Sequence, residues 1–140
     1  MNNPLSRSEF LAGAGLSSTD RIAVVDIGSN SVRLVVYNRG ARALIPLFNE
    51  KIFCGIGRKV QSTGKLDVDG MQKAIDALSR YRQLISSTRA VQVEAVATAA
   101  VRDASNGREF VAHAENVLNA PIRILSARSA VAGRISVVQF

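Results

Sequence analysis

The sequence predicts an α/β domain with a mixed sheet, in which strands and helices follow in the order βββαβαβ. Three short apolar segments separated by turns come first, a pattern typical of an antiparallel meander. Two amphipathic segments with helical periodicity then alternate with two apolar segments that are typical of buried parallel strands. A hydrophobic content of 47% in 140 residues is sufficient for one domain, or one lobe of a larger protein, with a core of its own.

The first two expected strands enclose the most distinctive segment of the chain, residues 21–37 with the sequence RIAVVDIGSNSVRLVVY. The first strand ends at the carboxylate of Asp26, and the second carries Arg33 near its start. The turn between them consists of Gly28, Ser29, Asn30 and Ser31. Backbone N–H groups and hydroxyls of such a turn can bind phosphate, Arg33 can add a forked cation, and Asp26 can hold a metal ion or its water. The segment therefore predicts a phosphate-binding hairpin.

A third strand is expected over residues 41–48, after a turn at residues 38–40 and with an interruption at Pro46. Residues 51–54 either prolong this strand or start a loop. The glycine-rich segment 55–64, GIGRKVQSTG, is interpreted as a surface loop. It does not fit a dinucleotide-binding fingerprint, because no third glycine and no immediate helix follow the GIG element.

The first helix is expected over residues 68–86, with Asp67 as its N-cap. Its apolar residues recur at steps of three and four and so share one face, which packs on the sheet; they are Met71, Ile75, Leu78, Tyr81 and Ile85. The cations Lys73, Arg80 and Arg82 are expected to face water.

A buried parallel strand is expected over residues 91–97, and it leads into a second polar segment, residues 98–107. Asn106 or Ser105 can cap a second helix over residues 107–118, and a last strand is expected over residues 122–125. His113 is expected to face solvent on this helix, because no Cys, Asp or Glu around it has the spacing of a metal site.

The charge balance of 18 basic to 11 acidic residues, a formal net charge of +7, favours acidic partners. The arginines are scattered and few aromatic residues accompany them, so nucleic-acid binding is not expected. Cys54, the single cysteine, is interpreted as a buried or half-buried structural thiol. No apolar run is long enough to span a membrane and no signal peptide is recognisable, so we expect no membrane partner and a cytoplasmic location.

Five segments, in their order and spacing, resemble the N-terminal lobe of the exopolyphosphatase / guanosine pentaphosphate phosphohydrolase family, within the actin-like ATPase superfamily. They are DIGSNSVRLVVY, PLFNEK, TGKL, ATAAVRDASNG and APIRILS. The resemblance covers residues 21–126. It implies an actin-like, ribonuclease H-like lobe. Residues 1–20 are rich in Asn, Ser and Gly and are expected to form a flexible leader, and residues 127–140, where the resemblance ends, are expected to be a divergent tail.

The resemblance also implies a site. In this family a cleft between two lobes binds polyphosphate or guanosine pentaphosphate with magnesium, and water attacks the terminal phosphoryl group. Asp26 would then serve the metal, residues 28–31 would cradle phosphate, and Arg33 would clamp its oxygens. Thr98 and Arg102 would lie near the cleft. The alternative for Arg102 is a structural salt bridge to Asp103 or Glu94.

Two departures from the family pattern bear on activity. The family continues after the last strand with a glycine and a run of glutamates that supply the catalytic base, whereas residues 127–140 hold no carboxylate. The second lobe, which would close the cleft, does not follow. These departures predict an inactive chain with no catalytic residue of its own, and a frameshift or truncation after Ser126 would explain them. Alternative interpretations are a lobe that works with a partner lobe or as a homodimer, a non-catalytic phosphate-binding or interaction domain, and a defunct fragment.

Overall fold

The structure is a computed structural model that describes residues 20–39 and 44–126. The expected leader, apart from Asp20, and the expected divergent tail lie outside these residues. The elements are β1 (Arg21–Ile27), β2 (Ser31–Arg39), β3 (Leu44–Phe53), α2 (Val60–Thr63), α3 (Val68–Thr88), β4 (Gln92–Ala97), α4 (Ala99–Asp103), α5 (Gly107–Leu118) and β5 (Ile122–Ile124). The predicted order βββαβαβ is confirmed, with the short helices α2 and α4 in addition.

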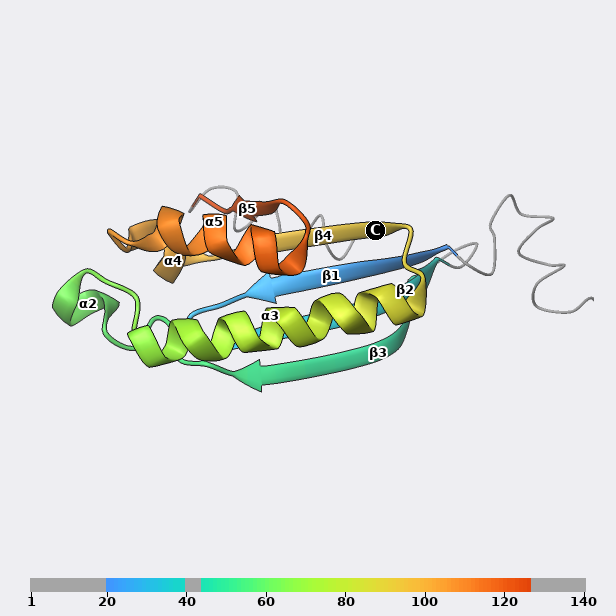
Figure 1. The fold of residues 1–140 in the computed structure, drawn as a ribbon, viewed down its shortest axis with the longest axis horizontal. Helices are drawn as coiled ribbons and strands as arrows, with labels where there is room; N and C mark the ends of the chain where they lie inside the picture. Colours follow the sequence, from blue (N-terminus) through green and yellow to red (C-terminus); the bar gives the residue numbers. More distant parts are fainter. Residues whose placement is uncertain (1–19, 40–43, 127–140) are drawn as a thin grey trace, which may run out of the picture.

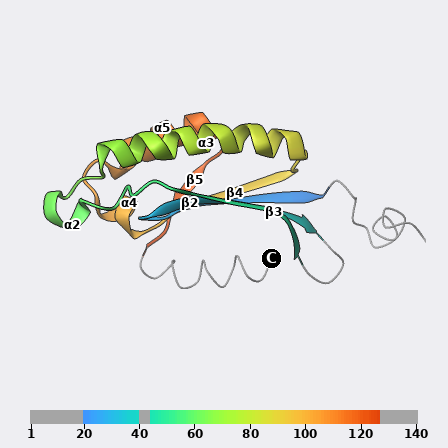
Figure 2. The ribbon, with the colours of Figure 1, turned by 90° about the horizontal axis from the view of Figure 1, so that it is seen from below.

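The five strands form one mixed sheet in the order β3-β2-β1-β4-β5. Strand β2 pairs antiparallel with both β1 and β3, whereas β4 pairs parallel with both β1 and β5. Helices α3 and α5 lie side by side over one face of the sheet (Figures 1 and 2). This arrangement follows from the sequence, because hairpins join antiparallel strands directly while parallel neighbours need a helical crossover.

Alternation along β2 shows how the strands build the core. Val32, Leu34 and Val36 are fully buried and belong to the core cluster under the helices, whereas Arg33 between them is exposed. Successive strand residues point to opposite faces, so the face opposite α3 and α5 carries the polar side chains at this end of the sheet.

Tyr81 on α3 is the largest fully buried side chain. Its hydroxyl donates to the carbonyl oxygen of Val32 on β2 at 2.9 Å, and the carbonyl oxygen of Glu50 on β3 lies 3.2 Å away. Burial, which disfavours the phenolate, raises the pKa of Tyr81 to about 12. The phenol therefore stays protonated and connects α3 to the sheet.

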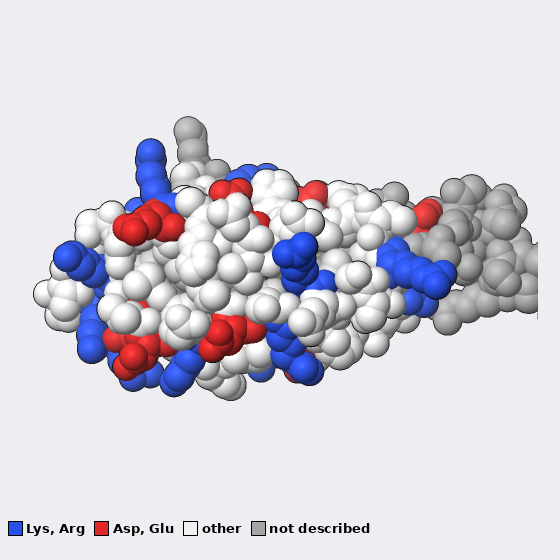
Figure 3. Space-filling model, viewed as in Figure 1, with Lys and Arg blue, Asp and Glu red and all other residues white. Residues whose placement is uncertain are grey.

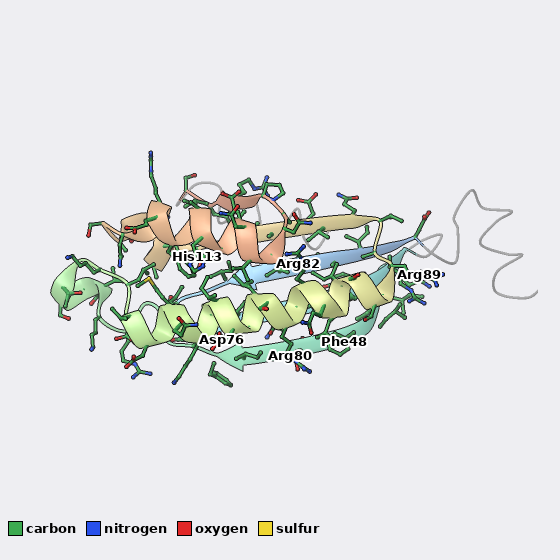
Figure 4. All side chains as sticks on the ribbon, viewed as in Figure 1. Phe48, Asp76, Arg80, Arg82, Arg89 and His113 are labelled. Atoms are coloured by element: carbon green, nitrogen blue, oxygen red, sulfur yellow. The ribbon has the colours of Figure 1, made fainter. Side chains whose placement is uncertain are left out.

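The first turn of α3 confirms the predicted cap. The Asp67 carboxylate accepts a hydrogen bond from the Gly70 N–H at 2.9 Å. Arg80, expected to face water, is exposed but also forms a fork of hydrogen bonds to the Glu50 carboxylate on β3, the shortest at 2.8 Å. Figure 4 shows Arg80 on the side of α3 that faces β3.

The interpretation of residues 55–64 as a surface loop is correct only in part, since residues 58, 59 and 61–64 are exposed. Ile56 is fully buried, and Val60–Thr63 form α2. Strand β3 runs on to Phe53, so residues 51–53 prolong it.

Asn106 occupies the N-cap position of α5, but its side chain accepts from the Leu66 N–H at 2.9 Å instead of capping the helix. Long-range contacts account for these differences, and local sequence patterns do not contain them.

Candidate functional site

The candidate site is built on the turn between β1 and β2. The Gly28 N–H donates to the Ser31 carbonyl oxygen at 2.9 Å and closes the turn. The carbonyl oxygen of Ser29 accepts from the Gly57 N–H at 2.9 Å, and that of Asn30 accepts from the N–H groups of Cys54 and Gly55 at 2.8 and 3.0 Å. The segment after β3 thus holds the turn by the carbonyl groups of Ser29 and Asn30.

Thr98 lies beside this turn. Its N–H donates to the Ile27 carbonyl oxygen at 3.0 Å, and its hydroxyl lies 3.3 Å from the same oxygen. A Cβ placed on Gly28 would lie 4.0 Å from the Thr98 hydroxyl oxygen. The cause is topological, since β1 and β4 are parallel neighbours and their carboxyl ends meet at one edge of the sheet.

Asp26 and Arg33 are directly opposite each other in the register of β1 and β2. Both are exposed, and both lie on the face opposite α3 and α5, because their strand neighbours Val25 and Leu34 point into the core under the helices. Side chains directly opposite in an antiparallel pair have Cβ atoms about 5 Å apart. A carboxylate and a guanidinium therefore lie together next to the turn.

Arg102 belongs to α4, which begins directly after Thr98. Its guanidinium donates to the Asp103 carboxylate at 2.9 Å, as the structural alternative predicts, while Glu94 accepts from the Gln92 side chain at 2.8 Å. Arg102 also lines a pocket of about 350 Å³ with Arg108, Ser105 and Ser126. The structure thus brings Asp26, Arg33, the turn and Thr98 together at one end of the sheet. The guanidinium of Arg102 is instead hydrogen-bonded to Asp103, its neighbour in the sequence.

Two residues at this end were not singled out from the sequence. A Cβ on Gly57 would lie 2.7 Å from the Ser29 Cβ and 2.9 Å from the Ala100 Cβ, so the turn, the segment after β3 and α4 converge where Gly57 has no side chain. The Arg58 guanidinium lies over Gly55, since a Cβ there would be 2.9 Å from its Nη2 atom. The sequence feature that could have revealed both close approaches is the Gly-x-Gly element at residues 55–57, immediately after a strand.

The remaining candidate groups have no geometry for chemistry. Cys54 is buried, as predicted, and burial raises the pKa of its thiol, so it is a poor nucleophile. His113 is exposed on α5, also as predicted, and lies along the groove between α3 and α5 (Figure 4). Within residues 20–39 and 44–126, no three His, Cys, Asp or Glu side chains form a cluster able to hold a metal ion.

Charges on the face that carries α3 and α5 alternate in sign. Figure 3 shows Lys and Arg side chains interspersed with Asp and Glu side chains over this face. A continuous cationic surface of the kind that binds nucleic-acid backbones is therefore not seen on it. None of the described helices combines the length and the hydropathy required to cross a bilayer.

Comparison with known proteins identifies the family. The family model of the Ppx/GppA phosphatase family matches residues 35–131. The chain belongs to this family. The resemblance found in the sequence motifs is thereby confirmed, together with the actin-like α/β fold.

Solved structures of the Ppx/GppA family agree with this assignment. The Aquifex aeolicus member is 32% identical with a TM-score of 0.73, over 76% of this chain and 35% of its own. An exopolyphosphatase from Cytophaga hutchinsonii is 28% identical with a TM-score of 0.70, over 75% of this chain and 34% of its own. The chain thus spans about a third of the length of the structures that it matches, and it corresponds to their N-terminal lobe.

Proposed function

We propose that the chain is the phosphate-binding lobe of a phosphohydrolase that acts on phosphoanhydrides, either polyphosphate or guanosine pentaphosphate. The lobe would bind the end of the phosphate chain at residues 28–31. In a complete enzyme a second lobe would close over it, and water would attack the terminal phosphoryl group.

The observation that carries this proposal is the convergence of donors at one end of the sheet. The carbonyl groups of Ser29 and Asn30 are occupied by the segment after β3, and the Gly28 N–H closes the turn. The N–H groups of Ser29 and Asn30 and the small hydroxyl side chains would then bind the anion. Thr98 adjoins Gly28, and Arg33 lies across the strand pair from Asp26. N–H groups, hydroxyls and a guanidinium together are suited to a phosphate group.

The residues present also fit a magnesium ion held jointly with a substrate. Magnesium in phosphoryl-transfer sites is commonly bound through one or two carboxylates, with phosphate oxygens and waters completing its shell. Asp26 would supply the carboxylate from the end of β1. A bound magnesium ion would neutralise charge on the phosphate chain, while Arg33 and the turn orient that chain.

Turnover by this chain alone is not part of the proposal. Residues 127–140 contain no carboxylate, and a general base typically contributes about 10²- to 10⁴-fold to rate. The absence of a carboxylate from residues 127–140 also favours the alternative function, which is phosphate binding without hydrolysis. Both versions require the same binding site.

The test is a calorimetric titration of the chain with inorganic tripolyphosphate in the presence of Mg²⁺, which measures the affinity. Arg33→Ala should weaken binding about tenfold or more, because a hydrogen bond to a charged group contributes roughly 1.5–3 kcal/mol. Arg82→Ala is the matched control, since Arg82 is an equally exposed arginine on α3, away from the turn (Figure 4). It removes the same charge from the molecule.

Equal weakening in both variants would contradict a specific site, because bulk attraction by the net charge would then explain binding. Absence of binding by the unaltered chain would contradict the proposal altogether. Phosphate release is measured in the same samples, and release by the chain alone would contradict the alternative without hydrolysis.

A further inference from the structure

We infer that Phe53, Lys51 and Arg33 form a patch that recognises the nucleoside end of a nucleoside polyphosphate whose phosphates occupy the turn. This inference rests on the proposed function and deepens it. Inorganic polyphosphate offers nothing for an aromatic ring to contact, so the patch distinguishes between the two substrate classes named above.

The first argument is position. In the register of β2 and β3, Phe53 is opposite Ser31 and Lys51 is opposite Arg33. Residues directly opposite each other in a sheet share a face, so all four side chains lie on the face opposite α3 and α5, the face that also carries Asp26. The next residue after Phe53, Cys54, donates its N–H to the Asn30 carbonyl oxygen at 2.8 Å. The backbone at Phe53 is thus held beside the turn at residues 28–31, about one strand spacing away.

The second argument is exposure and charge. The Phe53 side chain is 71% exposed, and the Lys51 ammonium lies 5.1 Å from the centre of its ring. A single exposed apolar side chain needs no explanation by itself. Here, however, the ring adjoins two exposed cations, Lys51 and Arg33, and a turn suited to phosphate. An aromatic ring bordered by cations is the combination that binds nucleotides through base stacking and phosphate contacts.

The geometry leaves room for a base. The ammonium of Lys51 stands over the ring of Phe53, and a cation in this position contacts one ring face only. Because Phe53 is 71% exposed, the base would stack on the opposite ring face. Lys51 and Arg33, on adjacent strands, would then contact the phosphates between the base and the turn. Stacking on a single ring tolerates any base, so the patch recognises a nucleoside and does not specify guanine.

The experiment compares two probes that each contain three linked phosphates, guanosine 5′-triphosphate and inorganic tripolyphosphate. Tripolyphosphate carries one more ionisable group, so charge alone would favour it over the nucleotide. The full chain should bind the nucleotide more tightly than tripolyphosphate. Phe53→Ala should weaken nucleotide binding about tenfold, since stacking of a base on an aromatic side chain contributes roughly 1–3 kcal/mol. Tripolyphosphate binding should not change.

Two further variants make the result specific. Phe53→Tyr keeps an aromatic ring and should retain nucleotide affinity, which also controls for any effect of alanine on the folding of β3. Val68→Ala removes another apolar side chain of similar exposure, 74%, at the start of α3. It should change neither affinity.

Each outcome has one meaning. If tripolyphosphate binds but the nucleotide has no advantage, or if Phe53→Ala lowers both affinities equally, the nucleoside patch is wrong and the phosphate site stands. If neither probe binds, the proposed function itself fails. Loss of nucleotide affinity in Phe53→Tyr as well as in Phe53→Ala would also contradict stacking.

Discussion

At the scale of single residues, the shape of the turn at residues 28–31 depends on Gly57, which lies outside it. Gly57 approaches Ser29 and Ala100 so closely that any side chain would displace one of them. Its N–H also donates to the Ser29 carbonyl oxygen at 2.9 Å. Steric fit and hydrogen bonding at Gly57 therefore both act on the turn, although Gly57 follows it by almost thirty residues in the sequence.

Gly57→Ala should destabilise the fold by about 1–3 kcal/mol, the usual cost of adding a methyl group to a fully packed site. It should also weaken tripolyphosphate binding, because Ser29 makes the closest contact with the added methyl group. Urea denaturation and calorimetry measure the two effects. Gly64→Ala is the control: Gly64 has φ +71° and no atom within 4 Å of an added Cβ, so backbone strain should lower stability without changing affinity. An unchanged affinity in Gly57→Ala would show that the turn keeps its shape without this contact.

At the scale of elements, α3 is positioned by its first turn. The Gly70 N–H donates to the carboxylate of Asp67, which also pairs with the ammonium of Lys59 at 3.2 Å. These contacts, the hydrogen bond from Gly70 foremost, lower the pKa of Asp67. The N-cap thus connects the start of α3 to the segment after β3, which supports the turn at residues 28–31.

The lowered pKa of Asp67 has a consequence for stability at acid pH. A carboxyl group with a lowered pKa in the folded state contributes stability above its unfolded pKa, which is 3.8 for Asp67, and the contribution is lost as the pH falls through the folded pKa. Asp67→Asn keeps an N-cap acceptor. It lacks the charge, so it should be less stable than the unaltered chain at pH 7 and lose less stability between pH 4 and pH 2. Asp67→Ala, which has no acceptor, should be less stable than Asp67→Asn at both pH values.

Chemical denaturation at each pH measures these differences. If the free energy of unfolding of Asp67→Asn falls as steeply in acid as that of the unaltered chain, other carboxylates cause the acid sensitivity.

At the scale of the whole molecule, the chain corresponds to one lobe of a two-lobed family. It matches about a third of the Aquifex aeolicus structure. Its candidate site lies at one end of the sheet, where β1 and β4 end and α4 begins. A site at the edge of one lobe can bind a ligand but can exclude water only when a second wall covers it.

The lobe should therefore regain hydrolysis when the remainder of a relative is joined to it. We expect a chimera in which residues 21–126 replace the matching part of the Aquifex aeolicus protein to release phosphate from polyphosphate, whereas the chain alone releases none. Phosphate release over time measures both. The same chimera with Arg33→Ala is the control and should be slower. A folded chimera without activity would contradict the equivalence of the two lobes.

Much of this fold could be predicted because local patterns carry it. The alternation of β2 and the three- and four-residue steps of Met71, Ile75 and Leu78 identify a strand and a helix without reference to the rest of the chain. The cap at Asp67 is equally local. The segment at residues 55–64 could not be predicted this way, because the burial of Ile56 depends on contacts with segments distant in sequence.

The sequence by itself determined the order of elements and the family, and it predicted the phosphate-binding role of residues 28–31, since periodicity, turn chemistry and motifs are properties of contiguous residues. Only the tertiary structure decided what surrounds that turn. The approach of Gly57 to Ser29, the bond of Arg102 to Asp103 and the place of Phe53 beside Ser31 all depend on the packing and register of segments brought together by folding. The physical reason is that a site assembled from several strand ends takes its geometry from the sheet, and the pairing of the sheet is long-range.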